Sequence, residues 1–151
     1  MFKVIVVGTD GSDTASRAVQ AAAELAGAAD GAVLHIVCVA KPVSHTAVAV
    51  AESASASAGV ARAEWEDDAA KDLAAVLDRA KASVADTAPS IETYARFGSP
   101  AEVLCELGDQ VRADLIVVGN RGMQGGRRFL GSVPNSVSHH APCSVLIVNT
   151  G

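Results

Sequence analysis

The stretch "ADLIVVGNRGMQGGRRFLGSV", residues 113–133, joins a short apolar run to a long glycine-rich connection. Its first six residues are mostly aliphatic, which is typical of a parallel strand buried on both faces. The connection that follows, residues 119–133, holds five glycines, three arginines and no acidic residue. Two interpretations are open: an ordinary turn with solvated arginines, or a loop that presents backbone amides to a phosphate.

Apolar runs and helical patterns alternate on both sides of this stretch. Strands are predicted at 2–7, 32–39, 91–97, 113–118 and 144–148, and helices from 12 or 13, over 62–84, from 99 and over 132–141. Residues 41–58 have no clear period and are predicted to form a loop. The alternation of strand and helix predicts an α/β fold with an open, parallel, five-stranded sheet and helices on both faces.

Two helix starts carry recognisable capping residues. Ser12 or Asp13 is the expected cap of the first helix, which Gly27 or Gly31 is expected to end. In "SPAE", residues 99–102, the serine is the expected N-cap, the proline the first helical residue and the glutamate the partner in a capping box.

Length and composition limit the classes of protein to consider. The chain has 151 residues, which favours one domain spanning 1–151, and a net charge of −5, which argues against a nucleic-acid-binding surface. No segment reaches the length of a membrane span, and the run 2–7 is too short for a signal peptide. Three cysteines without a Cys-x-x-Cys pair predict reduced thiols, so we expect a cytoplasmic protein.

Two strand ends are candidates for a ligand site. Open parallel sheets bind ligands beyond the carboxyl ends of their strands, where the strand order reverses. The segment "GTDGS", residues 8–12, follows the first strand, and the glycine-rich segment 119–133 follows the fourth. Gly131 and Ser132 lead into a helix, whose N-terminus offers unpaired N–H groups to an anion. If these two strands are neighbours, both segments line one crevice.

Other chemistry has little support in the sequence. There is no Walker-type loop and no Gly-x-Gly-x-x-Gly after the first strand. No nucleophile–base pair or metal-ligand cluster is apparent, so neither catalytic residues nor metal ligands are assigned. His35 is expected to pack in the core, and His139 and His140 to lie near a helix C-terminus.

The chain resembles the nucleotide-binding class of universal stress proteins. That class carries Gly-x2-Gly-x9-Gly-Ser/Thr after the fourth strand, whereas here eight residues separate Gly122 from Gly131. Further matches are "VIVVGTDGS", "FGSPAEVL", "ADLIVVGNRG" and "GSVPNSVSHHAPCSVLIV", in the family order. The resemblance implies a flavodoxin-like or Rossmann-like sheet of order 3-2-1-4-5, ATP binding, and a homodimer formed through the last strand, 144–148.

The resemblance also implies which residues touch the nucleotide. Gly8, Thr9 and Asp10 correspond to residues beside the adenosine, and Cys38 or its neighbour Val39 to the position whose backbone recognises adenine. The ribose and phosphate segment corresponds to Gly119, Asn120, Arg121, Gly122, Gly131, Ser132 and Val133.

The expected function is that of a nucleotide-responsive regulatory protein in the stress response. It would bind ATP, with Mg²⁺ or without it, and hydrolyse it slowly or not at all. Cyclic AMP is a second candidate ligand. Two different functions also remain open for the chain. One is a dimeric interaction protein that needs no nucleotide. The second is an enzyme similar to ATP pyrophosphatases, some of which carry a Ser-Gly-Gly-x-Asp-Ser loop after the first strand. The segment "GTDGSD" of this chain matches that loop only in part.

Overall fold

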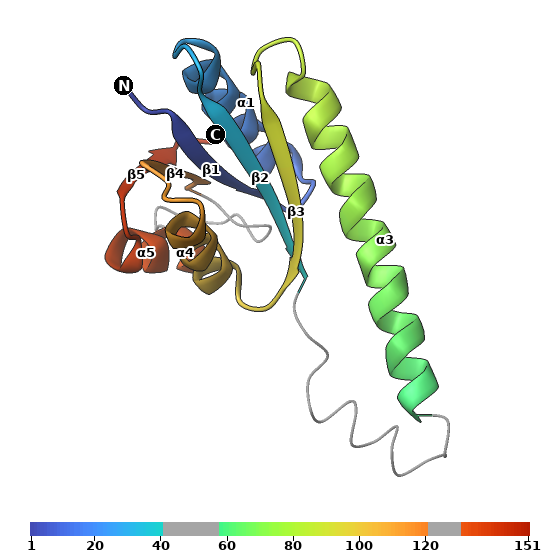
Figure 1. Ribbon diagram of the computed structural model, residues 1–151. Coiled ribbons are helices and arrows are strands. Elements are labelled where there is room, and N and C mark those ends of the chain that lie inside the picture. Colours follow the sequence, from blue (N-terminus) through green and yellow to red (C-terminus); the bar gives the residue numbers. More distant parts are fainter. Residues whose placement is uncertain (41–57, 121–130) are drawn as a thin grey trace.

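Five parallel strands form one sheet in the order β3-β2-β1-β4-β5 (Figure 1). The strands are β1 (Val4–Thr9), β2 (Val33–Ala40), β3 (Ile91–Phe97), β4 (Leu115–Gly119) and β5 (Ser144–Val148). The computed structural model describes residues 1–40, 58–120 and 131–151, so most of the loop predicted at 41–58 lies outside the described residues. The predicted fold class and strand order are confirmed.

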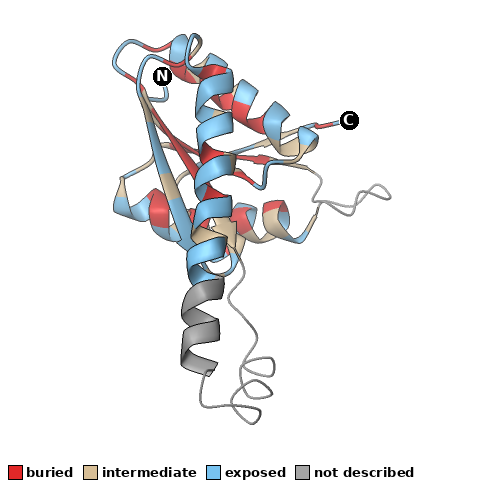
Figure 2. Ribbon diagram, turned by 90° about the vertical axis from the view of Figure 1, so that its right-hand side faces the viewer, coloured by how far each residue is buried: buried red, intermediate tan, exposed pale blue. Residues whose placement is uncertain are grey.

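Two pairs of helices cover the two faces of the sheet. Helices α1 (Asp13–Gly27) and α3 (Ala58–Val84) pack on one face, and α4 (Pro100–Gln110) and α5 (Ser132–His140) on the other. This arrangement follows from right-handed crossovers, because the chain reverses its direction across the sheet after β3. Figure 2 shows buried residues along the strands and on the sides of the helices that face them.

The core is built from small aliphatic side chains, as the low aromatic content of 3% requires. On α1, the buried stripe consists of alanines and one valine, which let the helix lie close to β1 and β4. On the other face, Gly108 of α4 lies so near the sheet that an added Cβ would meet Ile116 Cδ1 at 2.9 Å. Close helix–sheet approach therefore replaces bulky core packing in this protein.

Several predicted boundaries are shifted by a few residues. β1 and β4 begin two residues later than predicted and extend further at their carboxyl ends, and α3 begins four residues earlier. Gly8 and Thr9 belong to β1 because they continue the ladder opposite Val37 and Cys38. β3 and β5 have the predicted bounds.

The two helix starts differ in how they are capped. Ser12 is the N-cap of α1, and its hydroxyl accepts the N–H of Ala15 at 3.2 Å. Ser99 is the N-cap of α4 and Pro100 its first residue, as predicted, but the predicted capping box with Glu102 is wrong, because the Ser99 side chain makes no capping hydrogen bond. The missing N–H of Pro100 already removes one of the unpaired donors that a cap would serve.

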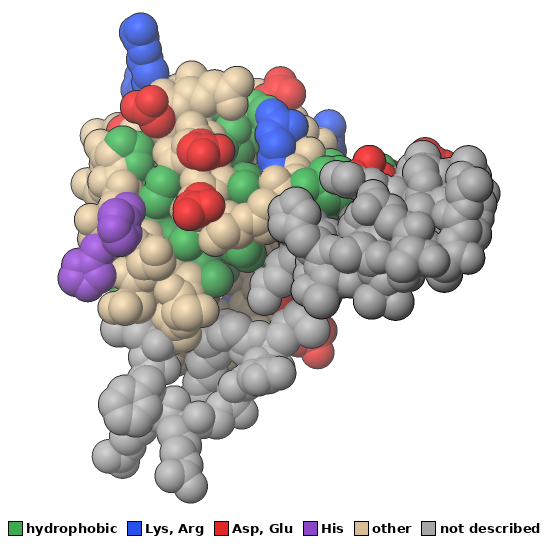
Figure 3. Space-filling view, turned by 90° about the horizontal axis from the view of Figure 1, so that it is seen from below, with side chains coloured by type: hydrophobic (Ala, Val, Ile, Leu, Met, Phe, Trp, Pro, Cys, Tyr) green, Lys and Arg blue, Asp and Glu red, His purple; other side chains and the backbone are tan. Residues whose placement is uncertain are grey.

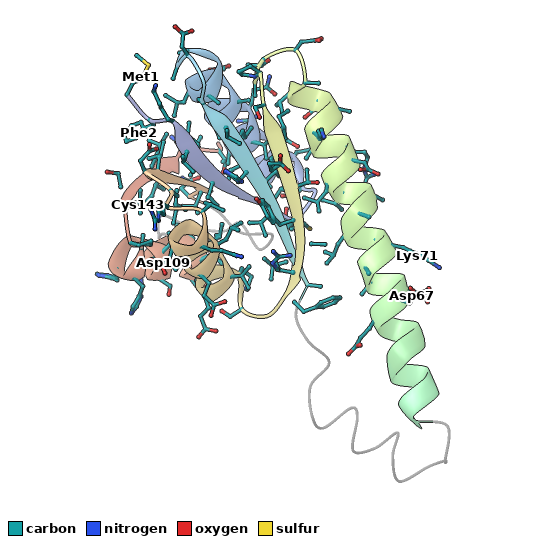
Figure 4. The ribbon with its side chains drawn as sticks, in the orientation of Figure 1. Met1, Phe2, Asp67, Lys71, Asp109 and Cys143 are labelled. Atoms are coloured by element: carbon teal, nitrogen blue, oxygen red, sulfur yellow. The ribbon has the colours of Figure 1, made fainter. Side chains whose placement is uncertain are left out.

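The described surface of α3 carries an exposed ion pair, with Lys71 Nζ and Asp67 Oδ2 at 3.2 Å (Figure 4). Both side chains are more than two-thirds exposed, so this pair adds little to stability. Within the described part of the chain, no helix is long and apolar enough to cross a membrane.

Candidate functional site

The two candidate strand ends lie side by side. β1 and β4 are neighbours in the sheet, with Ile5 opposite Leu115 and Val7 opposite Val117. Their carboxyl ends therefore meet where the strand order reverses, which is where open parallel sheets bind ligands. A cavity of about 180 Å³ lies at this place.

The cavity is lined by both predicted segments and by the helices next to them. The lining residues are Gly8, Thr9, Asp10, Ser12, Ala15, Val37, Val39, Pro100, Leu104, Val118, Gly119, Gly131, Ser132, Val133 and Pro134. Eight of the twelve sequence-predicted site residues are in this lining. Of the other four, Cys38 and Asn120 lie just outside it, and Arg121 and Gly122 lie outside the described residues.

One side of the cavity is apolar. Val37 and Val39 come from β2, Val118 from β4 and Leu104 from α4. Gly8 faces Leu104 across a short gap, since an added Cβ would lie 3.3 Å from both Leu104 methyl groups. This wall offers a planar apolar ligand a surface without competing hydrogen-bond groups.

The turn between β1 and α1 supplies the polar side. Thr9 Oγ1 accepts the N–H of Gly11 at 3.2 Å, and Asp10 Oδ1 accepts the N–H of Ser12 at 2.9 Å. Gly11 has φ +82°, a conformation that glycine adopts without strain. The N-cap of α1 is Ser12, one of the two residues expected there, so Asp10 does not cap the helix. The carboxylate of Asp10 is exposed beside the cavity.

The start of α5 is open toward the cavity. Gly131 is its N-cap and makes no side-chain cap bond, in contrast to Ser12 on α1. The first residues of α5, Ser132 and Val133, line the cavity, and Pro134 carries no N–H. The amides of Ser132 and Val133 and the hydroxyl of Ser132 are thus placed where a helix N-terminus binds an anion.

Cys38 and Val39 point to opposite faces of the sheet, as successive strand residues do. Val39 lines the cavity, whereas Cys38 is buried in the core formed with α1 and α3. Burial raises the pKa of the Cys38 thiol, and the nearby Asp10 carboxylate raises this pKa further. The thiol therefore stays protonated and unreactive at neutral pH.

Asn120 has a structural position next to the cavity. Its backbone N–H donates to Val148 O at 2.9 Å, and its carbonyl accepts the N–H of Gly131 at 3.2 Å. It therefore ties the end of β4 to β5 and to the start of α5. Its side chain is turned to the residues that follow β5 rather than to the cavity.

Of the described histidines, His35, His139 and His140 lie where the sequence predicts them. His35 is buried in β2, and its Nδ1 and the Tyr94 hydroxyl are 2.8 Å apart. Burial lowers the pKa of His35, while Glu92 partly opposes this shift. His139 and His140 are the last residues of α5. Over residues 1–40, 66–120 and 131–151, no group of three His, Cys, Asp or Glu side chains is suited to hold a metal ion.

Sequence reasoning missed most of the apolar wall. Strand alternation contained part of the signal, because Val37 and Val39 lie on the same face of β2. Leu104 and Pro100 come from a helix whose packing position depends on the crossover after β3, which no local pattern reveals.

Figure 3 shows the surface from below, with acidic side chains among apolar ones on the described part.

Proteins of known family share this architecture. The model of the universal stress protein family matches residues 1–149. Universal stress protein Rv1636 of Mycobacterium tuberculosis is 36% identical over 152 residues, covering 99% of this chain and 97% of the relative. A universal stress protein crystallised in complex with cAMP is 35% identical, with a TM-score of 0.70 and coverage of 99% and 98%. Universal stress protein UspA from Lactobacillus plantarum is 26% identical, with a TM-score of 0.80 and 97% coverage of both chains.

Proposed function

Because the chain belongs to the universal stress protein family, we propose that it binds an adenine nucleotide between β1 and β4 and acts as a nucleotide-responsive regulatory protein. The observation that carries this proposal is the start of α5, which has no side-chain cap, beside a cavity with an apolar wall at the strand ends. An apolar wall and an anion-binding helix end together suit a ligand with a flat base and a phosphate.

The three parts of a nucleotide have distinct places in this proposal. The adenine lies against Val39, Val118 and Leu104, where the backbone of β2 next to Val39 supplies hydrogen bonds to its edge. The ribose hydroxyls donate to the Asp10 carboxylate. The phosphates accept from the Ser132 and Val133 amides and from the Ser132 hydroxyl, with Arg121 and Gly122 as further proposed contacts.

ATP is the proposed ligand, and cyclic AMP is the second candidate. Cyclic AMP is included because a related universal stress protein was crystallised in complex with cAMP. Mg²⁺ would accompany ATP through the phosphate oxygens, as it does in most nucleotide sites. A cyclic monophosphate carries a single negative charge and needs fewer donors than a triphosphate.

We propose little or no ATP hydrolysis. The ionisable side chain in the described lining is Asp10, which accepts a hydrogen bond from Ser12, and the nearby Cys38 thiol is protonated. Neither side chain is arranged to activate an attacking water.

We also propose a domain organisation, an assembly and a location for the whole chain. Residues 1–151 act as one domain, which the family match over 1–149 supports. Two chains associate through β5, whose residue Leu146 is 37% exposed. A cytoplasmic location fits the three free thiols, Cys38, Cys105 and Cys143.

Titration calorimetry with ATP, ADP and cyclic AMP tests the proposal on matched variants. Val39 and Val111 are half-buried valines packed against the same core cluster, but only Val39 lines the cavity. Val39→Phe fills the cavity and is expected to weaken nucleotide binding at least about tenfold, whereas Val111→Phe retains wild-type affinity.

The outcomes separate the competing functions. Absence of binding heat with all three nucleotides would overturn the proposal and favour a nucleotide-independent interaction protein. Equal affinity of both variants would move the site away from this cavity. Rapid consumption of ATP with an acceptor would favour the pyrophosphatase-like enzyme.

A further inference from the structure

The residues after β5 form a polar network with the residue after β4. Asn120 Oδ1 accepts both the backbone N–H and the hydroxyl of Thr150, each at 2.9 Å. Asn120 Nδ2 donates to Asn149 Oδ1 at 3.3 Å. Both lone pairs of the Asn120 amide oxygen are thus used, which fixes the orientation of this side chain.

The network is partly buried, with Thr150 inside and Asn149 exposed, and it reaches two helices. Thr150 is 3% exposed, and its carbonyl accepts a hydrogen bond from Arg17 Nη1 of α1 at 3.1 Å. The carbonyl of Asn120 accepts the N–H of Gly131, the N-cap of α5. We call these four residues the tail brace: Asn120, Asn149, Thr150 and Arg17. The tail brace connects β4, the residues after β5, α1 and α5.

The tail brace adjoins the cavity without lining it. The cavity lining includes Gly119, which precedes Asn120 in the chain, and Gly131, whose N–H donates to the Asn120 carbonyl. Asn120 and Thr150 themselves do not line the cavity. A shift of Asn120 would change the distance between the end of β4 and the start of α5. Both of these ends line the cavity in which the proposed ligand lies.

We propose that Asn120 and Thr150 are positioning residues, through which the C-terminal tail sets the nucleotide affinity of a site that it does not touch. This inference rests on the proposed nucleotide function. Coupling between two sites is reciprocal, so a bound nucleotide must also stabilise the hydrogen bonds of Thr150.

The experiment compares two threonine variants with a control. Thr150→Val removes the hydroxyl while it keeps the shape of the side chain. Thr150→Ser keeps the hydroxyl and removes the methyl group. Thr93→Val is the matched control, because Thr93 is exposed on β3 at the other end of the sheet order. ATP affinity is measured by calorimetry, and exchange of the Thr150 amide is measured by NMR in the wild type, with and without ATP.

The tail brace predicts that Thr150→Val weakens ATP binding about tenfold, while Thr150→Ser and Thr93→Val stay within about twofold of the wild type. It also predicts slower exchange of the Thr150 amide when ATP is bound, a result that requires no variant to fold. Two results would overturn the role of the tail brace alone. One is ATP binding by the wild type without slower exchange of the Thr150 amide, and the other is a Thr150→Val variant with wild-type ATP affinity. A wild type that binds no nucleotide would overturn the brace together with the proposed function.

Discussion

Asp114 joins the beginning of the central strand β1 to the segment before β4 through hydrogen bonds. Its carboxylate accepts the backbone N–H of Lys3 at 2.9 Å and that of Val4 at 3.2 Å, at the point where β1 begins beside β4. Asp114→Asn replaces one acceptor oxygen with a donor and removes the charge. We expect a loss of about 1 kcal/mol in the free energy of unfolding, measured with urea.

Asp67→Asn is the matched control for this prediction, because it removes a carboxylate whose partner is an exposed lysine. This variant is expected to change the unfolding free energy by less than about 0.5 kcal/mol. Equal effects of the two substitutions would show that the Asp114 bonds do not contribute as described.

His35 gives the fold a pH dependence of known sign. Burial lowers the pKa of His35 in the folded state, so the unfolded chain takes up this proton at a higher pH than the folded chain. The stability contribution is present above the ordinary pKa of histidine and is lost as the pH falls through the lower folded value. Urea unfolding between about pH 7.5 and 5.5 should therefore show a steeper loss for the wild type than for His35→Gln. Parallel pH profiles would contradict this account.

At the scale of elements, the C-terminal end of α1 lies directly against the segment after α3. A Cβ added at Gly27 would overlap the backbone carbonyl of Thr87, which has no flexible end to move away. Gly27→Ala is expected to lower the unfolding free energy by about 1–3 kcal/mol, which exceeds the helix-propensity gain. The exposed Gln20 of the same helix provides the control Gln20→Ala, and increased stability of Gly27→Ala would refute the close contact.

The elements themselves follow from local patterns, but their ends depend on partners. The strands at 91–97 and 144–148 are bounded by turn residues and have the predicted limits. β1 continues to Thr9 because β2 offers a partner for Gly8 and Thr9, and no propensity of these residues predicts this extension. The capping box at Ser99 failed for a related reason, since the motif specifies candidate groups without fixing the rotamers that would join them.

At the scale of the whole molecule, β5 ends the sheet with an exposed apolar side chain. An unprotected edge strand is a template for pairing with another chain. We expect the wild type to be a dimer by light scattering at tens of micromolar, and Leu146→Lys to be a monomer. Phe97→Lys adds the same charge at the β3 end of the sheet and should remain dimeric. A monomeric wild type would contradict the proposed interface.

The candidate site could be predicted from the sequence as far as its glycines and polar turn. The segments 8–12 and 119–133 are recognisable as unusual strand ends, and the fold brings Gly8, Gly119 and Ser132 together as expected. The role of Asn120 could not be predicted, because its partners Asn149 and Thr150 are joined to it by the pairing of β4 with β5. Contacts between distant segments require the assembled sheet.

A proton–nitrogen NMR spectrum recorded with increasing ATP tests the central claim, that an adenine nucleotide binds at the carboxyl ends of β1 and β4. We expect shifts for the amides of Gly8, Gly119 and Ser132, which line the cavity. The signals of Gly31 and Ala88, which precede β2 and β3 at the opposite ends of the strands, should stay unchanged. Shifts concentrated at Gly31 and Ala88, or no shift at any concentration of ATP, would contradict it.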